Sequence, residues 1–457
     1  MTRSTKRRPA YLTELARFAC RAQLKDLDSR ALERTRWVIA DSLPVIAAGM
    51  QQPEMQAFVH KHLAAGGGGL AWVLGTRRRA SPLNAALLNG TAGTWLELDE
   101  GNLLAKGHPG IQVVPAAVAL AQESGAHGAE LLMAVALGYE ISSRISRAAT
   151  IKLSVHPHGT WGVLGAAIAA GRLKKFDEAK MLELLNVAST MGMATSRQTL
   201  LDGSTVRNIF TGHAGFMGLM ASRLVESGFT GEIDSPANVY GKVLGDAFDP
   251  AKVVETLGRE WMVADGYFKL HPTGRYVHSA IDALEDLLSR VEGKRLEPAS
   301  IERIEVRAYK LAAMLAELRV TSSFGARFSV PFALASILHH GGSGLVPFEQ
   351  AAVDNEAIQS LAARVDLRED EQFTARYPGE QRCDLKVILK DGKRLEGRCL
   401  VMKGEPANPH SEGELEGKFM QLGVPLWGEE TARGLLEGCM GLEKIENFGT
   451  FADGFNL

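Results

Sequence analysis

Apolar residues recur at helical spacing from residue 11 to about residue 260, and this long run constrains the fold most strongly. Leu12 and Leu15 show the period at the start of the run. Asp41 and Ser42 fall inside a second apolar run, so we expect them at a helix–helix contact. The pattern predicts a set of packed helices over this part of the chain.

Small residues gather on one face of a Gly/Ala-rich stretch within this helical part. They are Gly162, Gly165, Ala166, Ala169 and Ala170. A face without large side chains lets helix backbones approach closely. We therefore expect this helix to be buried and tightly packed against its neighbours.

The pattern changes after about residue 267. Two alternating runs, Cys383–Leu389 and Arg394–Val401, flank Asp391-Gly392, which is a strong hairpin signal. Ile301 opens another expected strand. Helical stretches are expected between the strands, at 279–291, 330–339 and 355–363.

Helical spacing returns near the end of the chain, at 412–422 and 430–442, and we expect these segments to pack on the first helices. The predicted fold is mainly α. A large all-helical domain is formed by residues 1–266 and 405–457, and a smaller α+β domain, residues 267–404, is inserted into it.

Composition excludes several classes of protein. A chain of 457 residues is too long for one ordinary hydrophobic core. A formal net charge of −2 gives no basic surface for nucleic acid. No apolar run reaches the roughly 18–20 residues of a membrane span. The basic residues 3–8 lack the apolar core of a signal peptide. Four scattered cysteines without a CxxC pair indicate a reducing compartment. We predict a cytoplasmic protein that binds neither nucleic acid nor membrane.

Four polar clusters interrupt the apolar stretches. The first holds Glu97, Asp99 and Glu100, followed by His108 and Pro109. On a helix, Glu97 and Glu100 would share a face and Asp99 would point elsewhere. Pro109 is expected to begin the next helix. The alternative is an ordinary charged helix end with a turn.

The second cluster, His156-Pro157-His158, precedes the Gly/Ala-rich helix. A histidine at a helix N-terminus has a lowered pKa, and neutral imidazole can act as a general base. In the third cluster Arg207 follows an Asp-Gly turn, and its guanidinium suits a carboxylate. The alternatives are a structural histidine and a surface arginine.

The fourth cluster brings Lys269, His271, Arg275 and His278 into ten residues at the expected domain junction, where ligand sites are common. A solvated basic loop is the alternative. These histidines and acids could instead bind a metal. The i,i+2 spacing of the two histidines around Pro157 and the lack of HExxH or EF-hand motifs argue against it. We therefore expect no metal and no other cofactor.

Taken together, these segments resemble the MmgE/PrpD family. The resemblance rests on the segments LNGTAGTWLELDEGN, GHPGIQVVPAAVALAQ, GYEISSRISRA, HPHGTWGVLGAAIAAGRL, DGSTVRNIFTGHAG and FKLHPTGRYVHSAIDAL, which occur in this order along nearly the whole chain. Members include 2-methylcitrate dehydratase, cis-aconitate decarboxylase and iminodisuccinate epimerase. The resemblance implies a large helical domain with an α+β lid, a site between them, no cofactor, and a homodimer.

The resemblance assigns family positions to residues of this chain. The acidic motif falls on Glu97, Asp99 and Glu100, and the lid lysine on Lys269. The two HP histidines are His108 and His156. Four departures touch positions linked to the decarboxylase and make that activity less expected: Glu97 for aspartate, Gly101 for threonine, Arg207 for lysine and Phe332 for tyrosine.

The resemblance implies a cofactor-independent lyase acting on a small di- or tricarboxylic acid. We expect a hydro-lyase like 2-methylcitrate dehydratase, which removes an α-proton and then a β-hydroxyl. Expected catalytic residues are Asp99, His108, His156 and Lys269. Expected substrate-binding residues are Glu97, Glu100, His158, Arg207, Arg275 and His278. The alternatives are an epimerase or isomerase, a decarboxylase, and a non-catalytic carboxylate-binding protein.

Overall fold

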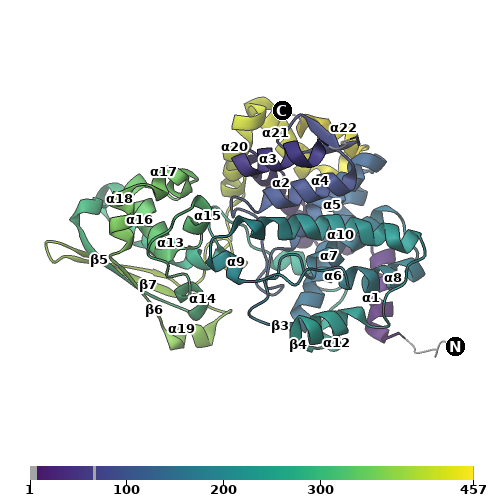
Figure 1. Ribbon diagram of the computed structural model, residues 1–457, viewed down its shortest axis with the longest axis horizontal. Helices are drawn as coiled ribbons and strands as arrows, with labels where there is room; N and C mark the ends of the chain where they lie inside the picture. Colours follow the sequence, from purple (N-terminus) through teal and green to yellow (C-terminus); the bar gives the residue numbers. More distant parts are fainter. Residues whose placement is uncertain (1–7, 65–67, 456–457) are drawn as a thin grey trace.

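The computed structural model of the protein describes residues 8–64 and 68–455. Helices dominate, and Figure 1 shows them gathered in a bundle beside a smaller part that contains a sheet. The longer bundle helices are α1 (Ala10–Arg21), α2 (Ser29–Gly49), α3 (Pro53–Leu63), α4 (Pro82–Gly93), α5 (Pro109–Ser124), α6 (Gly128–Ala148), α7 (Gly162–Leu173), α8 (Glu178–Ser189), α10 (Ile209–Glu226), α20 (Glu412–Trp427) and α21 (Glu429–Met440). Four shorter helices join them: α9 (Gln198–Leu201), α11 (Ser235–Asn238), α12 (Pro250–Val254) and α22 (Phe448–Ala452). The mainly α fold is confirmed.

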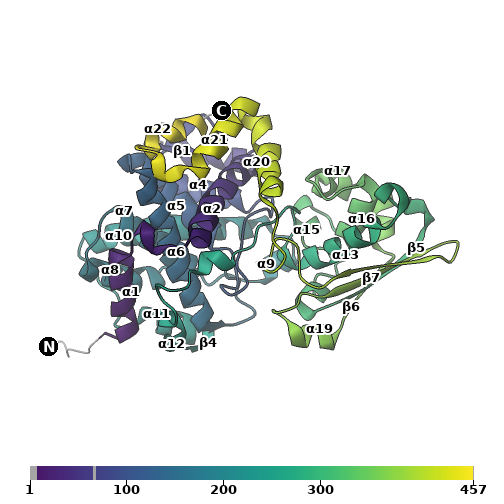
Figure 2. The ribbon, with the colours of Figure 1, turned by 180° about the vertical axis from the view of Figure 1, so that it is seen from behind.

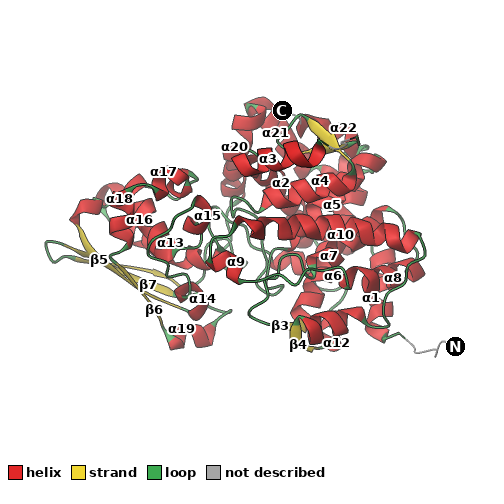
Figure 3. Ribbon diagram, viewed as in Figure 1, coloured by secondary structure: helices red, strands yellow, loops and turns green. Residues whose placement is uncertain are grey.

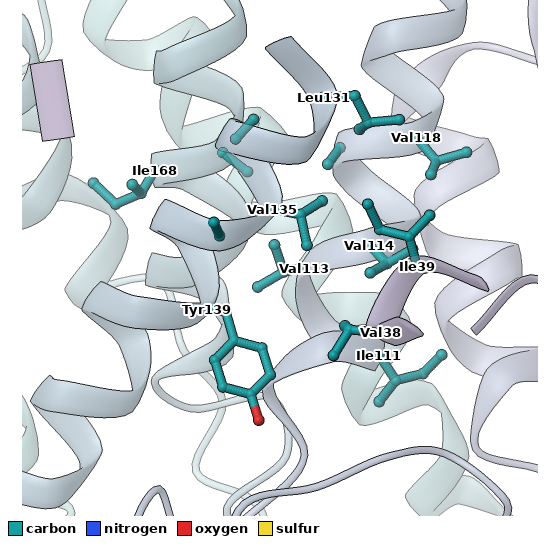
Figure 4. Packing of buried hydrophobic residues seen from close by; sticks show 14 of the residues in the cluster. Val38, Ile39, Ile111, Val113, Val114, Val118, Leu131, Val135, Tyr139 and Ile168 are labelled. Atoms are coloured by element: carbon teal, nitrogen blue, oxygen red, sulfur yellow. The ribbon is translucent and has the colours of Figure 1, made fainter. Parts of the chain in front are cut away.

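The core of the bundle lies where α2, α5, α6 and α7 meet. Figure 4 shows Val113 and Val114 of α5 beside Val38 of α2 and Val135 of α6. Almost every residue of α5 and α7 is buried, so these two helices are central rather than amphipathic.

Small residues bring α7 against its neighbours, as predicted. A Cβ atom on Gly165 would lie 2.8 Å from Ser142 Oγ and 2.9 Å from the carbonyl oxygen of Gly138, both on α6. A Cβ on Gly218 of α10 would lie 2.4 Å from the Cβ of Ala166. Larger side chains at these positions would force the helices apart.

The C-terminal helices pack on the first helices, as predicted. Asp41 of α2 is buried and accepts a hydrogen bond of 2.6 Å from Lys418 Nζ of α20. The same ammonium group donates to the carbonyl oxygen of Leu98 at 2.7 Å. The position of Asp41 at a helix–helix contact is therefore confirmed.

Residues 277–402 form a second hydrophobic core around a four-stranded sheet, and we call them the sheet region. The strand order is β6 (Val365–Glu369), β5 (Ile301–Ala308), β7 (Cys383–Leu389), β8 (Arg394–Cys399). β5 and β6 are parallel, and the other pairs are antiparallel. The predicted hairpin joins β7 and β8, and Gly392 adopts the positive φ of 86° that its turn requires.

Helices cover one face of this sheet, as Figures 2 and 3 show. They include α13 (His278–Ser289), α16 (Val330–His340) and α18 (Glu356–Ala362), close to the predicted segments. The remaining helices are short: α14 (Lys310–Ala313), α15 (Ser323–Ala326), α17 (Gln350–Val353) and α19 (Glu371–Arg376). The other face carries charged side chains in alternation with the buried ones, as expected for a sheet with one solvated side.

The bundle is not entirely helical, in contrast to the prediction. It contains two short antiparallel ribbons, β1 (Ala71–Val73) with β2 (Arg78–Ala80) and β3 (Ala149–Ile151) with β4 (Gly245–Phe248). The domain boundaries at residues 267 and 404 stay a prediction. The basic N-terminus is described only from Arg8 onward. Within the described ranges, no helix combines the length and the apolar character needed to cross a bilayer.

Candidate active site

The acidic cluster lies in an irregular segment between α4 and α5, not on a helix. Glu97 has a positive φ of 53°, a left-handed conformation that costs roughly 1–2 kcal/mol for a residue with a side chain. The prediction that Glu97 and Glu100 share a helical face is therefore wrong. Pro109 begins α5 and His108 precedes it as the N-cap residue, as predicted.

Two acids and two bases form a buried charge network. Glu97 pairs with Arg207, and Lys269 Nζ lies 3.6 Å from Glu97 Oε2 and 3.1 Å from Asp99 Oδ1. All four side chains are almost completely buried, so each charge depends on its partner for compensation. The network balances two negative against two positive formal charges, and the ion pairs hold Glu97 in its left-handed conformation.

His108 is held by two oxygen atoms at its Nδ1. This nitrogen lies 2.6 Å from the carbonyl oxygen of Glu100 and 3.0 Å from Asp99 Oδ2. A carbonyl oxygen only accepts, so Nδ1 carries a proton, and in the neutral form of the ring the lone pair is on Nε2. Burial alone would raise the pKa of Asp99, but His108 and Lys269 outweigh it and hold that pKa well below its usual range.

Glu100 lies behind this site. Its carboxyl group accepts hydrogen bonds from the backbone N–H of Gly110 and from the Tyr139 hydroxyl, the latter at 3.1 Å. Burial raises the pKa of Glu100 to about 8, although these two hydrogen bonds oppose the shift. Glu100 thus fastens the start of α5 to α6, and its carboxyl group does not face the cavity described below.

His156 and His158 complete a row of three imidazole rings. The ring centroids of His108 and His158 are 4.9 Å apart, and those of His156 and His158 are 4.6 Å apart. His156 Nδ1 accepts from the backbone N–H of His158 at 3.1 Å. Both ring nitrogens of His158 are buried and have no hydrogen-bond partner among the described residues.

The two histidines are neutral for a reason that differs from the prediction. Burial, followed by the charge of Arg207, lowers the pKa of both His156 and His158 well below the usual value. The following helix begins only at Gly162, and His156 instead donates its backbone N–H to Thr195. Desolvation and a neighbouring cation therefore replace the expected helix dipole as the cause.

Arg275 is already paired with a carboxylate. Its Nη2 lies 2.6 Å from Glu405 Oε1, and its guanidinium carbon lies 4.3 Å from the centre of the Tyr267 ring. His278 Nδ1 accepts from Arg275 Nη1 at 3.1 Å. Glu405 thus neutralises the cation that sequence patterns assigned to the substrate.

A cavity of about 390 Å³ lies between the bundle and the sheet region. Of the predicted site residues, those that line it are Glu97, His108, His156, His158, Arg207 and Arg275. Asp99 and Lys269 do not line the cavity and lie behind its wall. Lys269 contacts the lining residue Glu97, and Asp99 contacts the lining residue His108. Glu100 and His278 are not among the lining residues.

Several lining residues had no pattern that marked them. Lys106 and Arg197 are isolated cations, and Tyr377 comes from a separate segment of the sheet region. Tyr267 adjoins the predicted basic cluster and Tyr276 lies within it, next to Arg275, which is the one signal that pointed to these two rings. The others reach the cavity only through tertiary packing.

Among the residues that the structure describes, two groups of side chains have the geometry to hold a cation. They are Asp99 with His108 and His158, and His271 with Asp282 and Glu285. In the first group Lys269 already places a positive charge 3.1 Å from Asp99, which repels a divalent ion. In the second, His271 pairs with Asp282 at 3.4 Å. Metal independence stays a prediction.

Two of the four departures from the MmgE/PrpD pattern, Gly101 and Phe332, have structural consequences. A Cβ atom on Gly101 would lie 2.3 Å from the Tyr267 hydroxyl, so threonine does not fit there without moving that ring. Phe332 is fully buried in the core of the sheet region and does not line the cavity. The acid–base site of this chain therefore forms without a hydroxyl at either position.

The fold and the site together define a mainly α protein whose buried acid–base cluster lies between a helical bundle and an α+β part. A family model described as "MmgE/PrpD N-terminal domain" matches residues 13–245, and one described as "MmgE/PrpD C-terminal domain" matches residues 271–442. The chain belongs to the MmgE/PrpD family.

Curated relatives are similar over most of their length. A "Cis-aconitate decarboxylase-like protein oryM" of Aspergillus oryzae is 23% identical, with 94% of each chain covered. The human cis-aconitate decarboxylase is 24% identical over 81% of this chain and 78% of its own. The cis-aconitate decarboxylase of Aspergillus terreus is 24% identical over 79% of each chain.

Proposed function

We propose that the protein is a lyase that removes the α-proton of a small di- or tricarboxylic acid and then expels its β-hydroxyl. The observation that carries the proposal is His108, whose Nδ1 is fixed by Glu100 and Asp99 while its ring lines the cavity. A base held in one tautomer presents a lone pair of defined direction to a substrate C–H bond.

The rest of the cluster suits the charge that develops after proton removal. Arg207 places positive charge at the cavity wall and Lys269 places it behind the wall, where the low dielectric strengthens their attraction for an enediolate. His158 is neutral, buried and unpartnered, so its N–H can donate to a substrate carboxylate or hydroxyl. These groups bind and polarise the acid. His108 takes the α-proton as the C–H bond breaks and, once protonated, gives it to the β-hydroxyl, which leaves as water as the carbon–carbon double bond forms.

Dehydration fits the geometry of His108 better than decarboxylation does. Dehydration begins with removal of an α-proton, and the Nε2 lone pair of His108 is free to accept it. Decarboxylation of an unsaturated acid instead ends with a proton delivered to carbon, which requires a protonated donor. Protonation of the enediolate on its other face would give epimerisation, which remains the alternative use of the same intermediate.

Decarboxylation is the second candidate, and the names of the curated relatives favour it. Two of the relatives described above are named cis-aconitate decarboxylases, and a third is named a cis-aconitate decarboxylase-like protein. Their identity of 23–24% leaves room for a different reaction on a related acid.

The test is an assay of the purified protein in heavy water against saturated hydroxy acids and unsaturated acids. A hydro-lyase yields an unsaturated acid and exchanges the α-proton for deuterium. A decarboxylase releases carbon dioxide from the unsaturated acids, and a binding protein does neither. We expect the activity to survive exhaustive chelation, and activity restored only by added metal would contradict the proposal of a cofactor-free site.

A further inference from the structure

We propose that His271, Asp282 and Glu285 bind a divalent transition-metal ion such as Zn²⁺. An imidazole nitrogen of the histidine and one carboxylate oxygen from each acid lie within 4.8 Å of one another. None of the three residues lines the cavity that holds the acid–base cluster, so this is a second site in the molecule. The inference goes beyond the proposed function and does not depend on it.

The three side chains come from two segments that the fold brings together. His271 lies in the segment that precedes α13, and Asp282 and Glu285 lie three positions apart on α13, so the two acids share one face of the helix. Asp282 and Glu285 also line a surface cavity of about 500 Å³, which gives an ion a path from solvent. An ion bound here would fasten the preceding segment to α13.

Hydrogen bonds fix the tautomer of His271. The Ser343 hydroxyl donates to Glu285 Oε1 at 3.2 Å, because a carboxylate oxygen only accepts. Ser343 Oγ then accepts the proton of His271 Nδ1, which lies 2.8 Å away. The neutral ring therefore has its lone pair on Nε2. A hydrogen bond from the other ring nitrogen is also what orients a histidine that binds a metal.

The lone pair of His271 Nε2 faces an oxygen atom that lacks a hydrogen bond. Asp282 Oδ1 is buried, has no hydrogen-bond partner among the described residues, and lies 3.4 Å from Nε2. An N–H···O hydrogen bond spans roughly 2.7–3.2 Å, so a shared proton fits this spacing poorly. Two ligands that each lie about 2.0–2.1 Å from a tetrahedral zinc ion are roughly 3.3 Å apart, so a shared metal ion fits it well.

The protein supplies no cationic side chain to the two acids. Among the residues that the structure describes, no lysine or arginine forms an ion pair with Asp282 or Glu285, whereas Asp99 in the other candidate group pairs with Lys269. Glu285 is exposed, so its side chain can turn toward an ion. Mg²⁺ and Ca²⁺ prefer oxygen ligands alone, and the imidazole therefore favours a transition metal.

The experiment is a calorimetric titration of Zn²⁺ into the full-length protein, purified without a histidine tag and stripped of metal by chelation. We expect one Zn²⁺ to bind per chain and the Tm to rise with Zn²⁺ concentration, because an ion that binds the folded state stabilises it. Mg²⁺ should bind far more weakly. Zn²⁺ binding no tighter than that of Mg²⁺ would overturn the inference.

Two substitutions test the location of the ion. Glu285→Gln and Asp282→Asn each remove one ligand and should weaken Zn²⁺ binding by at least roughly tenfold. The exposed position of Glu285 keeps the test valid if Asp282→Asn fails to fold. Asp286→Asn is the matched control, because Asp286 lines the same surface cavity but pairs with Arg290 at 2.7 Å. An affinity as high in Glu285→Gln as in Asp286→Asn would place the ion elsewhere and overturn the assignment.

Discussion

The three cavity histidines differ in which ring nitrogen remains free. His108 donates from Nδ1 to Glu100, which leaves the lone pair of Nε2 for a substrate. His156 accepts at Nδ1 from the backbone N–H of His158, and its Nε2 faces the Nε–H of Arg207 at 3.4 Å, so both of its ring nitrogens are already engaged. His158 has no protein partner among the described residues and can donate or accept. His108 is therefore the best-placed base.

The first prediction concerns His108. Replacement of His108 by Gln should keep a donor toward Glu100 and remove proton transfer. General acid–base groups contribute about 10² to 10⁴-fold, so kcat should fall by at least roughly 100-fold. The measurement is steady-state turnover of the acid identified in the assay, together with deuterium exchange.

Two other histidine variants serve as comparisons. His156→Gln should lower kcat less than His108→Gln, because the glutamine oxygen can still accept from the N–H of His158. His60→Gln is the control, since His60 is exposed on α3. A His108→Gln enzyme as active as the His60→Gln enzyme would end the assignment of His108 as base.

The second prediction is a pH-dependent contribution of Glu100 to stability. Burial of the carboxyl group raises its folded pKa to about 8, from an ordinary value of 4.5. The protonated group is favoured in the folded state, so the stabilisation is complete below about pH 4.5 and is lost as pH rises toward 8. Glu100→Gln should therefore gain stability relative to the wild type between pH 5 and 8. The measurement is the free energy of unfolding in urea for both proteins at several pH values. A difference between the two proteins that does not change with pH would contradict the raised pKa of Glu100.

Some site residues were predictable because they interrupt apolar runs. His108 and Lys269 stand out in that way, and both belong to the buried cluster. Glu405 and Arg197 have no such context, and their roles depend on which distant segments the fold brings together. The left-handed backbone of Glu97 was unpredictable as well, because its ion pairs rather than local propensity stabilise it.

At the scale of elements, α20 positions the irregular segment that carries the acidic cluster. Lys418 of α20 binds Asp41 of α2 and the carbonyl oxygen of Leu98, one residue before Asp99. A C-terminal helix thus fixes the backbone beside the acid that orients His108.

The third prediction tests this contact. Lys418→Met should leave Asp41 buried without its partner, and breaking a buried ion pair costs about 3–5 kcal/mol. The measurement is the free energy of unfolding in urea. Adding Asp41→Asn to Lys418→Met should recover part of the loss, because the uncompensated charge is removed.

A surface pair provides the control for that prediction. Arg433 and Glu429 lie one turn apart on α21 at 3.4 Å, and both are exposed. Exposed pairs contribute about 0–1 kcal/mol, so Arg433→Met should change stability little. Equal losses for Lys418→Met and Arg433→Met would show that the buried pair does not hold α20 in place.

Long periodic elements were predictable, and short irregular ones were not. The β7–β8 hairpin and α16 follow from alternation and helical spacing, which local sequence determines. The three-residue strands β1 and β3 have too few residues for a period, and each exists because a partner strand lies beside it.

At the scale of the whole molecule, polar contacts join the bundle to the sheet region around the cavity. Arg327 of the sheet region is buried and donates to the carbonyl oxygens of Leu96 at 3.2 Å and Pro272 at 2.9 Å. Gly101 and Tyr267 exchange two backbone hydrogen bonds nearby. These contacts fix the acidic segment against both regions, so the cavity has a defined shape before a ligand binds.

The last prediction is a homodimer formed through the bundle. Val206, Phe229 and Val243 are each more than half exposed, and all three belong to the helical part of the chain. Apolar side chains exposed in this way are candidates for burial between subunits. Light scattering at micromolar concentration should give about twice the chain mass of 49.3 kDa.

Charge placed on two of these side chains tests whether they lie in the interface. Phe229→Glu combined with Val243→Glu should lower the mass toward that of one chain, because a buried carboxylate without a partner is costly. Leu318→Glu alters an exposed leucine of the sheet region and should leave the dimer intact. A single-chain mass for the wild type would contradict the dimer. A dimer that persists in the double variant would show that Phe229 and Val243 lie outside the interface. The interface would then have to form through another part of the bundle.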